Sequence, residues 1–159
     1  MNWGIHRPPG SSSGLSAPRR SLARMTTSAA QTSISGTPRA TAASRQALGA
    51  YGEEVAARHL HGLGYAVLER NWRCDIGEVD LVCRDGSTLV ICEVKTRTSL
   101  AAGTPHEAIT DAKLDRLKRL GERWAADRGI HPDGIRIDLV AVLRPRRGPA
   151  QVDHVRGLV

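Results

Sequence analysis

Two acidic residues and a lysine lie within otherwise apolar segments near the middle of the chain. Asp80 lies in segment 77–82, and Glu93 and Lys95 lie at the end of segment 88–95. Charged side chains inside apolar strands are unfavourable unless they are paired or bind a metal ion. Two carboxylates and a lysine on one face of a sheet can hold a divalent cation and activate a water molecule. This pattern predicts the chemistry of phosphodiester cleavage.

The turn between the two segments sets which side chains share a face. The Asp-Gly pair at residues 85–86 predicts a β-hairpin with a two-residue type I′ turn. In that register Glu78 lies opposite Glu93, and Asp80 is diagonal to Glu93, within about 7–8 Å. Because side chains alternate across a strand, these carboxylates and Lys95 then share one face of the sheet. We expect the opposite face, which includes Val79, Leu81 and Cys83, to be apolar and to pack on a helix.

A second interpretation of the same pattern requires no functional site. A solvated ribbon, apolar inside and charged outside, would form ion pairs between Lys95 and Glu93 or Glu78. Directly opposed like charges destabilise a sheet, however. The predicted pairing of Glu78 with Glu93 therefore counts against a solvated face, but the spacing alone leaves both interpretations open.

The net charge of the chain is concentrated in its first fifty residues. The chain has 159 residues and a formal net charge of +7, of which six arginines in residues 1–50 supply +6 with no acidic residue beside them. The remaining residues carry +1. The strongly basic composition is therefore not evidence that the folded part binds nucleic acid.

Residues 1–45 are rich in Ser, Thr, Pro and Gly and poor in large apolar side chains. Such a segment buries too little surface to offset its ordering entropy, so we expect a disordered tail followed by one folded domain, 46–159. The Arg- and Ser-rich, acid-free composition is that of a transit peptide. A flexible arm that contacts phosphates, an extension without a role, and translation from Met25 are the alternatives.

The cysteines and the hydropathy pattern favour a cytoplasmic protein. Cys74, Cys83 and Cys92 form no C-x-x-C pair and have no histidine at ligand spacing, which disfavours a zinc site or a disulfide framework. Reduced thiols are typical of the cytoplasm. No segment approaches the roughly eighteen apolar residues that span a bilayer, and no signal-peptide segment is present. We therefore expect no membrane partner.

The periodicity predicts two helices and five strands. A first helix begins near Arg45 and ends at Gly62-Leu63-Gly64, and its small residues Gly49, Gly52 and Ala56 would allow a close approach to a neighbour. Strands at 65–70, 77–82, 88–95 and 135–143, a helix at 111–128 and a short strand at 151–155 follow. The main order, α-β-β-β-α-β, predicts an α/β domain with a mixed central sheet flanked by helices.

The acidic residues and the lysine of the predicted hairpin resemble a known sequence signature. Asp80 followed by Glu93-Val94-Lys95 resembles the D…(D/E)-x-K signature of the restriction-endonuclease-like nuclease superfamily. The longer pattern in 77–82 and 90–97, with Gly52-Glu53, Arg70-Asn71-Trp72-Arg73 and Lys113, closely resembles the YraN family of uncharacterised bacterial proteins over residues 46–143. The resemblance implies a restriction-endonuclease-like αβββαβ core related to that of Holliday-junction resolvases. Val79 stands where the wider superfamily often has proline.

The resemblance also implies roles for individual residues. Asp80 and Glu93 would be carboxylate ligands of Mg²⁺ or Mn²⁺, and the backbone carbonyl of Val94 would be a further ligand. Lys95 would orient or help deprotonate the attacking water. Glu53 matches the upstream acid of the superfamily and would help with a second ion; an exposed helical glutamate is the alternative.

Other positions carry two interpretations each. Lys113, Arg116 and Arg119 would contact nucleic-acid phosphates, or they belong to a solvated basic helix face. Glu78 is a candidate for supporting the ligands. Asp138 resembles a family position, but pairing with Arg136 explains it equally well.

Together these features predict a metal-dependent nuclease that acts on DNA, including branched or structured DNA. The alternative is a non-catalytic nucleic-acid-binding module that keeps the fold. The presence of Asp80, Glu93 and Lys95 together favours the enzyme. Five aromatic residues are too few for a single-strand stacking platform, and a scaffold protein leaves the charged face unexplained. The pattern is compatible with a homodimer.

Overall fold

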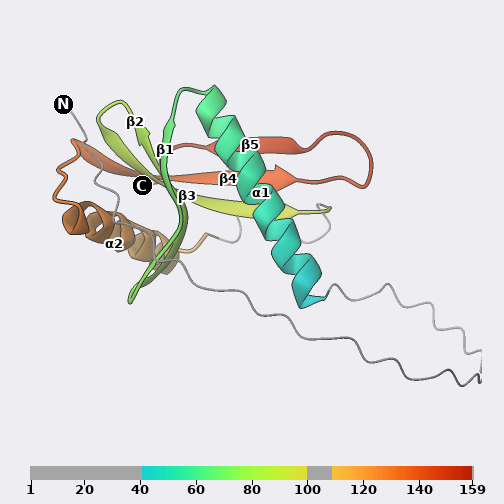
Figure 1. Cartoon of the computed structure of the whole chain (residues 1–159), viewed down its shortest axis with the longest axis horizontal. Helices are drawn as coiled ribbons and strands as arrows, with labels where there is room; N and C mark the ends of the chain where they lie inside the picture. The colour runs from blue at the N-terminus through green and yellow to red at the C-terminus, as the bar shows by residue number, and fades with distance from the viewer. Residues whose placement is uncertain (1–40, 100–108, 159) are drawn as a thin grey trace, which may run out of the picture. The chain divides into compact units, whose positions relative to one another are not determined.

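The computed structural model describes residues 41–99 and 109–158. The elements in chain order are α1 (Ala42–Gly62), β1 (Ala66–Cys74), β2 (Gly77–Asp85), β3 (Thr88–Arg97), α2 (Asp111–Asp127), β4 (Gly134–Leu143) and β5 (Gln151–Val155) (Figure 1). The predicted disordered tail lies outside the described residues, except for residues 41–45. These form the N-cap and first turn of α1, because the Thr41 side chain accepts the N–H of Ser44.

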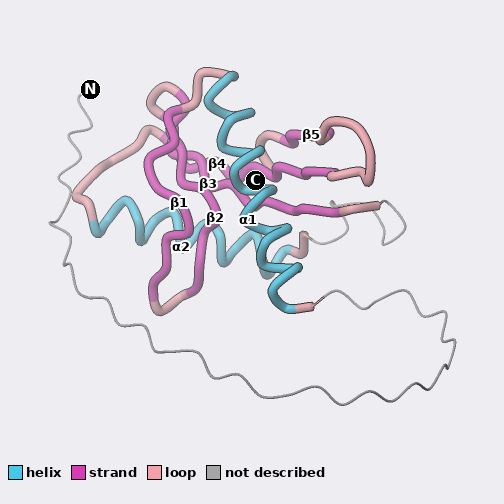
Figure 2. Tube along the Cα trace, turned by 45° about the vertical axis from the view of Figure 1, so that its right-hand side comes forward, coloured by secondary structure: helices cyan, strands magenta, loops and turns pink. Residues whose placement is uncertain are grey.

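The five strands form one mixed sheet in the order β1-β2-β3-β4-β5. The β3–β4 pair is parallel and the other pairs are antiparallel, so α2 is the crossover that a parallel pair requires. Figure 1 and Figure 2 show α1 and α2 on opposite sides of the sheet. The predicted α/β class, the order of elements and the mixed sheet flanked by helices are confirmed.

Each helix covers its own apolar cluster. On the α1 face the buried residues include Ala56, Leu60, Leu81, Cys83, Val90, Cys92 and Val140. On the α2 face they include Val79, Val82, Ile91, Leu117, Leu120, Trp124 and Ile137. Residues 90–92 of β3 alternate between the two clusters, as expected for a strand buried on both faces.

The β2–β3 hairpin has a different register from the predicted one. Asp85 pairs with Thr88, so the loop consists of Gly86 and Ser87. Within the described residues only Gly86 of these two has a positive φ, 61°, which is what a type II′ turn requires. The type I′ prediction is wrong, because glycine occupies the first loop position rather than the second.

This register moves the acidic residues relative to one another. Leu81 pairs with Cys92, so Asp80 comes level with Glu93 instead of diagonal to it. The predicted opposition of Glu78 and Glu93 is wrong, because this register brings residue 95 level with Glu78. On its other side Glu78 pairs with Arg73 of β1, and its carboxylate lies 2.8 Å from the Arg73 guanidinium. A shift of two residues preserves the alternation of faces, which is why the error did not change the predicted side of Glu93.

Strand alternation is interrupted at Asp80. Val79 was expected on the face of Leu81, but it packs in the α2 cluster, so that prediction is wrong. The cause lies opposite on β1, which continues to Cys74 instead of ending at residue 70. There Asn71 has a φ of 51°, unusual for a residue other than glycine, and it is skipped in the pairing with β2. The resulting bend turns Val79 toward α2.

The α1 helix comes closest to the sheet at Gly52. A Cβ atom at this position would lie 1.7 Å from Oγ1 and 2.8 Å from Cβ of Thr96 on β3. Ala56, one turn later, is fully buried. Gly49 has no neighbour within 4 Å of its position. The close approach predicted from the small residues is therefore made by Gly52 and Ala56, without Gly49.

Replacing Gly52 by alanine should destabilise the protein by about 1–3 kcal/mol, because α1 or Thr96 must move to admit the methyl group. Urea unfolding followed by circular dichroism would measure the loss. Gly49→Ala is the matched control, since it lies in the same helix without a clash and should stabilise by up to about 1 kcal/mol. Equal effects of the two substitutions would contradict the close approach.

Candidate functional site

The Asp80 carboxylate lies at the fork where β2 and β3 separate. The described pairing of the two strands ends at Leu81 and Cys92. Beyond it, Oδ2 of Asp80 accepts the N–H of Val94 at 2.7 Å. Because the N–H groups of a strand lie in the plane of the sheet, this carboxylate takes the place of a main-chain acceptor. The C=O of a strand residue points to the same neighbour as its N–H, so the Val94 carbonyl is also directed toward the fork.

Glu93 is held by two lysines from different elements. Glu93 is only 8% exposed. Its Oε1 atom accepts hydrogen bonds from Nζ of Lys113 at 2.5 Å and from Nζ of Lys95 at 3.3 Å. Lys95 lies two residues further along the same face of β3. Lys113 reaches Glu93 from the first turn of α2, whose N-cap is Thr110.

The environment of Asp80 is dominated by negative charge. Burial is the main reason that the pKa of Asp80 rises to about 6; the bond from Val94 lowers this pKa, and the charges of Glu93, Glu53 and Glu78 raise it further. Among residues 41–99 and 109–158, no cationic side chain forms an ion pair with Asp80. The fork therefore carries negative charge that a bound cation would stabilise.

The metal-free protein should become less stable as the pH rises from about 4 to about 6. The folded-state pKa of Asp80 is higher than its ordinary value of 3.8, so the native state binds the proton more tightly than the unfolded state in this window. Stability that protonated Asp80 contributes at low pH is lost as the carboxyl ionises, by about 1–3 kcal/mol.

Urea unfolding in EDTA across this pH range would measure the effect. Asp80→Asn is the reference, because other groups, such as His59, whose pKa is lowered mainly by burial, also contribute to the pH dependence of stability. The difference between wild type and Asp80→Asn isolates the carboxyl. A pH-independent difference would contradict the raised pKa.

The α1 helix adds an acidic residue through a partner on β1. Oε2 of Glu53 accepts a bond from Nδ2 of Asn71 at 2.8 Å, while the adjacent Glu54 pairs with Arg70 at 2.6 Å. Of the two neighbouring glutamates, Glu53 is the one whose charge acts on Asp80. The helix reaches this position because Gly52 allows its close approach to β3.

Two of these contacts, those of Asn71 and Lys113, were not predicted from the sequence. Asn71 was noted only as part of a motif, yet it bends β1 beside Asp80 and orients Glu53. The signal was its residue type, because asparagine tolerates a positive φ better than most residues. Lys113 was assigned to phosphate or to solvent, but its side chain is only 19% exposed and contacts Glu93. No pattern in the sequence indicated that contact.

The oxygen atoms grouped at the fork suit a hard divalent cation. Across the described residues, no three His, Cys, Asp or Glu side chains form a ready-made metal cluster. The donors present are the carboxylates of Asp80 and Glu93 and the carbonyl of Val94, the all-oxygen set that Mg²⁺ and Mn²⁺ prefer. The excess negative charge around Asp80 fits the same kind of ion. A cation at this place would compete with Lys113 for Glu93.

A groove lies between the β1–β2 turn and α2. Its volume is about 420 Å³, and it is lined by Arg73, Cys74, Gly77, Glu78 and Arg116. Arg116 lies three residues after Lys113, so both side chains are on adjacent positions of one helix face. Arg119 is exposed on α2 and does not line the groove. Because Arg73 pairs with Glu78 of the same lining at 2.8 Å, the net positive charge of the groove is that of Arg116.

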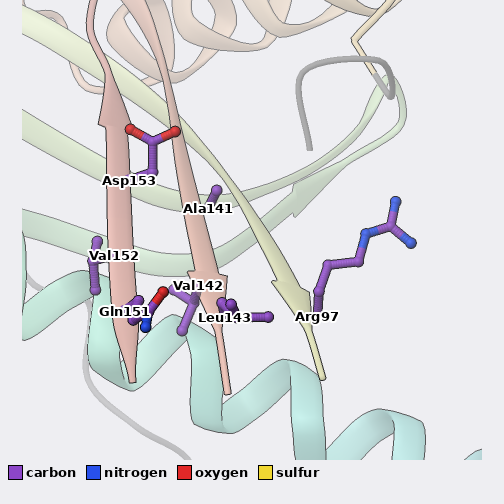
Figure 3. Close-up of a pocket in the computed structure, with 7 residues that line it drawn as sticks. All are labelled: Arg97, Ala141, Val142, Leu143, Gln151, Val152 and Asp153. Atoms are coloured by element: carbon purple, nitrogen blue, oxygen red, sulfur yellow. The ribbon is translucent and has the colours of Figure 1, made fainter. Parts of the chain in front are cut away.

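A second cavity, of about 240 Å³, lies at the carboxyl end of β3 (Figure 3). Figure 3 shows Arg97 directed away from Gln151 and Asp153, the other polar residues of its lining. These groups do not converge on a common point. This cavity is therefore a weaker candidate for catalysis than the fork.

Asp138 belongs to a buried network and not to the fork. It is fully buried and accepts bonds from Nε of Arg136 at 2.9 Å, Nε2 of His154 at 3.0 Å and the N–H of Gly157 at 3.0 Å. Burial raises the pKa of Asp138, but the bonds from Arg136, Gly157 and His154 outweigh it, and the pKa is lowered. The predicted pairing with Arg136 is confirmed. None of the described contacts joins Asp138 to Asp80 or Glu93.

Comparisons with known proteins give a consistent result. A family model described as "Uncharacterised protein family UPF0102" matches residues 52–142, which include the fork and Lys113. A UPF0102 protein of Nocardioides sp. is 65% identical over 77% of this chain and 98% of its own length. UPF0102 proteins of Beutenbergia cavernae and Streptomyces coelicolor are 59% and 55% identical, each over 72% of this chain and over 97% and 89% of their own lengths. Their names state no activity.

Within the described part of the chain, no helix is both long and apolar enough to cross a membrane.

Proposed function

The chain belongs to the uncharacterised protein family UPF0102, the YraN family of the sequence resemblance, and from this premise we propose that it is a metal-dependent nuclease that hydrolyses phosphodiester bonds of DNA. The observation that carries the proposal is the pair of carboxylates at the fork. Asp80 and Glu93 are level on adjacent strands, and Asp80 has a raised pKa among three other acids. A carboxyl whose pKa is perturbed by burial and by nearby charges is a reasonable pointer to a functional site.

The residues of the fork have distinct roles in this proposal. Asp80, Glu93 and the Val94 carbonyl would hold Mg²⁺ or Mn²⁺, which when bound polarises a phosphate and lowers the pKa of a water molecule. Lys95 orients that water and stabilises charge on the phosphate, because its ammonium group lies beside Glu93 and its side chain is 34% exposed. Glu53, oriented by Asn71, contributes further negative charge for a second ion.

The groove between the β1–β2 turn and α2 is the proposed path of the nucleic-acid backbone. Arg116 supplies the net positive charge there, because Arg73 pairs with Glu78, and Lys113, three residues before Arg116 on α2, contacts Glu93. Arginine binds phosphate oxygens in a planar, bidentate manner. The exposed side chain of Arg119 would contact phosphates outside the groove.

Arg116→Ala should weaken DNA binding several-fold and reduce the slope of log affinity against log salt by about one, as expected for the loss of one phosphate contact. Fluorescence anisotropy with a labelled duplex at several salt concentrations would measure both quantities. Arg58→Ala is the control, because Arg58 is an exposed arginine on α1 that pairs with Glu54. If Arg58→Ala lowers the slope as much as Arg116→Ala, the groove is not a preferred path.

The proposed activity is tested by incubating the full chain with four-way junction, flap, duplex and single-stranded DNA and with Mg²⁺ or Mn²⁺. Cleavage that is lost in Asp80→Asn and Lys95→Ala supports the nuclease. Cleavage that persists in both variants indicates a contaminant. DNA binding without cleavage of any substrate would favour a non-catalytic nucleic-acid-binding module.

We place this proposed activity in the cytoplasm. The three cysteines are free thiols, which suits a reducing cytoplasm.

A homodimer would allow two forks to act on the two strands of a branched or duplex substrate. Sedimentation with and without DNA would measure the oligomeric state.

A further inference from the structure

We propose that Lys113 is an exchangeable counter-ion, which neutralises Glu93 in the metal-free protein and moves to a DNA phosphate when a divalent ion binds. This inference rests on the proposed function and adds a positioning residue with two alternative partners. It makes metal binding and DNA binding depend on each other through one side chain.

The first support is the uneven distribution of charge at the fork. Glu93 receives two ammonium groups, from Lys113 at 2.5 Å and Lys95 at 3.3 Å, on the same carboxylate oxygen. Asp80, level with Glu93, accepts the N–H of Val94 but forms no ion pair with a cationic side chain of the described residues. Among the described residues, one carboxylate is thus compensated by two lysines while its neighbour is compensated by no lysine or arginine.

The second support is the burial of both partners. The side chain of Glu93 is 11% exposed and that of Lys113 is 19% exposed. A buried charge that loses its partner is strongly unfavourable. A divalent ion between Asp80 and Glu93 satisfies both carboxylates, so Lys113 no longer stabilises Glu93 and itself requires a new anionic partner.

The third support is the position of Lys113 on α2. It lies three residues before Arg116, which lines the basic groove. The Thr110 N-cap fixes the first turn of the helix, since the Thr110 side chain accepts the N–H of Lys113. The flexible four-carbon stem of a lysine allows its ammonium group to turn from Glu93 toward a phosphate in the groove without movement of the helix. DNA thus supplies a new anionic partner for Lys113 once the divalent ion has displaced it from Glu93.

The inference predicts effects of opposite sign for one substitution. Lys113→Ala removes a competitor of the divalent ion, so we expect Mn²⁺ to bind about tenfold more tightly in the absence of DNA. The same variant lacks the phosphate contact, so DNA should bind several-fold more weakly when Ca²⁺ is present as a poorly reactive substitute ion. A residue that only supports the fold would not shift the two affinities in opposite directions.

Isothermal titration of the EDTA-treated full chain with Mn²⁺ tests the first effect, with Lys118→Ala as the matched control. Lys118 is an exposed lysine of the same helix, and its removal should leave Mn²⁺ affinity unchanged. Lys113→Gln is a second variant that keeps the length of the side chain, and it should tighten Mn²⁺ binding in the same direction. Anisotropy with labelled DNA, in Ca²⁺ and in EDTA, tests the second effect.

The outcomes separate this inference from the proposed function. If Mn²⁺ binds the wild type and is lost in Asp80→Asn, but binds Lys113→Ala and Lys113→Gln no more tightly, the counter-ion role is overturned and the metal site stands. If the wild type and both Lys113 variants bind no Mn²⁺, the inference and the metal-dependent function are overturned together. Tighter Mn²⁺ binding with weaker DNA binding in Ca²⁺ supports the exchange.

Discussion

Asp80→Asn should reduce the rate of DNA cleavage by about three orders of magnitude. The substitution keeps the size of the side chain and an oxygen that can accept the N–H of Val94, but it removes the negative charge that would hold the divalent ion. A metal ion contributes several kcal/mol to stabilising a phosphoryl transition state, and each 1.36 kcal/mol corresponds to a factor of about ten in rate. Single-turnover cleavage of a labelled substrate at saturating protein would measure the loss.

The stability of the same variant shows whether the loss is chemical. Because ionised Asp80 is buried among other acids, Asp80→Asn should leave the metal-free protein equally or more stable at pH 7. Asp133→Asn, at an exposed position, is the control and should retain full activity. Undiminished cleavage by Asp80→Asn would falsify the assignment of the fork as the active site.

Asp138→Ala should destabilise the fold by about 3–5 kcal/mol, the largest effect on stability that we expect from one substitution. Asp138 is fully buried and is the shared acceptor for Arg136, His154 and the N–H of Gly157. Its removal leaves the Arg136 guanidinium with reduced compensation and removes the side-chain bonds that join His154 and Gly157 to β4, while the main-chain pairing of β4 and β5 remains. Since small domains are stable by only about 5–15 kcal/mol, the variant should approach its unfolding midpoint under mild conditions.

Thermal and urea unfolding, followed by circular dichroism, would measure this change. Asp138→Asn is the milder companion variant, because it keeps part of the hydrogen bonding. Asp133→Ala is the surface control and should alter the free energy of unfolding by less than about 0.5 kcal/mol. If Asp138→Ala abolished cleavage with unchanged stability, Asp138 would belong to the chemistry and not to the structural network.

Much of the fold follows from local patterns in the sequence. Apolar periodicity predicted α2, β4 and β5 within about one residue of their observed bounds, because each is amphipathic or buried along its length. The small residues of α1 predicted a close approach to a neighbouring element, and Gly52 makes this approach to β3. Alternation along β3 predicted that Glu93 and Lys95 share a face, and their side chains lie 3.3 Å apart.

Local sequence patterns did not determine the register of the β2–β3 hairpin. Asp-Gly and Gly-Ser are both acceptable two-residue turns, and a shift of two residues leaves every side chain on its face. The choice depends on pairing along the whole hairpin and with β1. That choice decides whether Asp80 or Glu78 lies level with Glu93.

The residue types of the fork, the strands that carry them and the order of the elements could all be predicted from the sequence, because they depend on neighbours a few residues apart. Three features emerge only from the packing of the fold: Lys113 reaches Glu93, Asn71 orients Glu53, and Asp80 lies without a cationic partner among the described residues. These contacts join residues on different elements, and their distances depend on how α1 and α2 pack on the sheet. Packing is a property of the whole core, and periodicity within one element does not specify it.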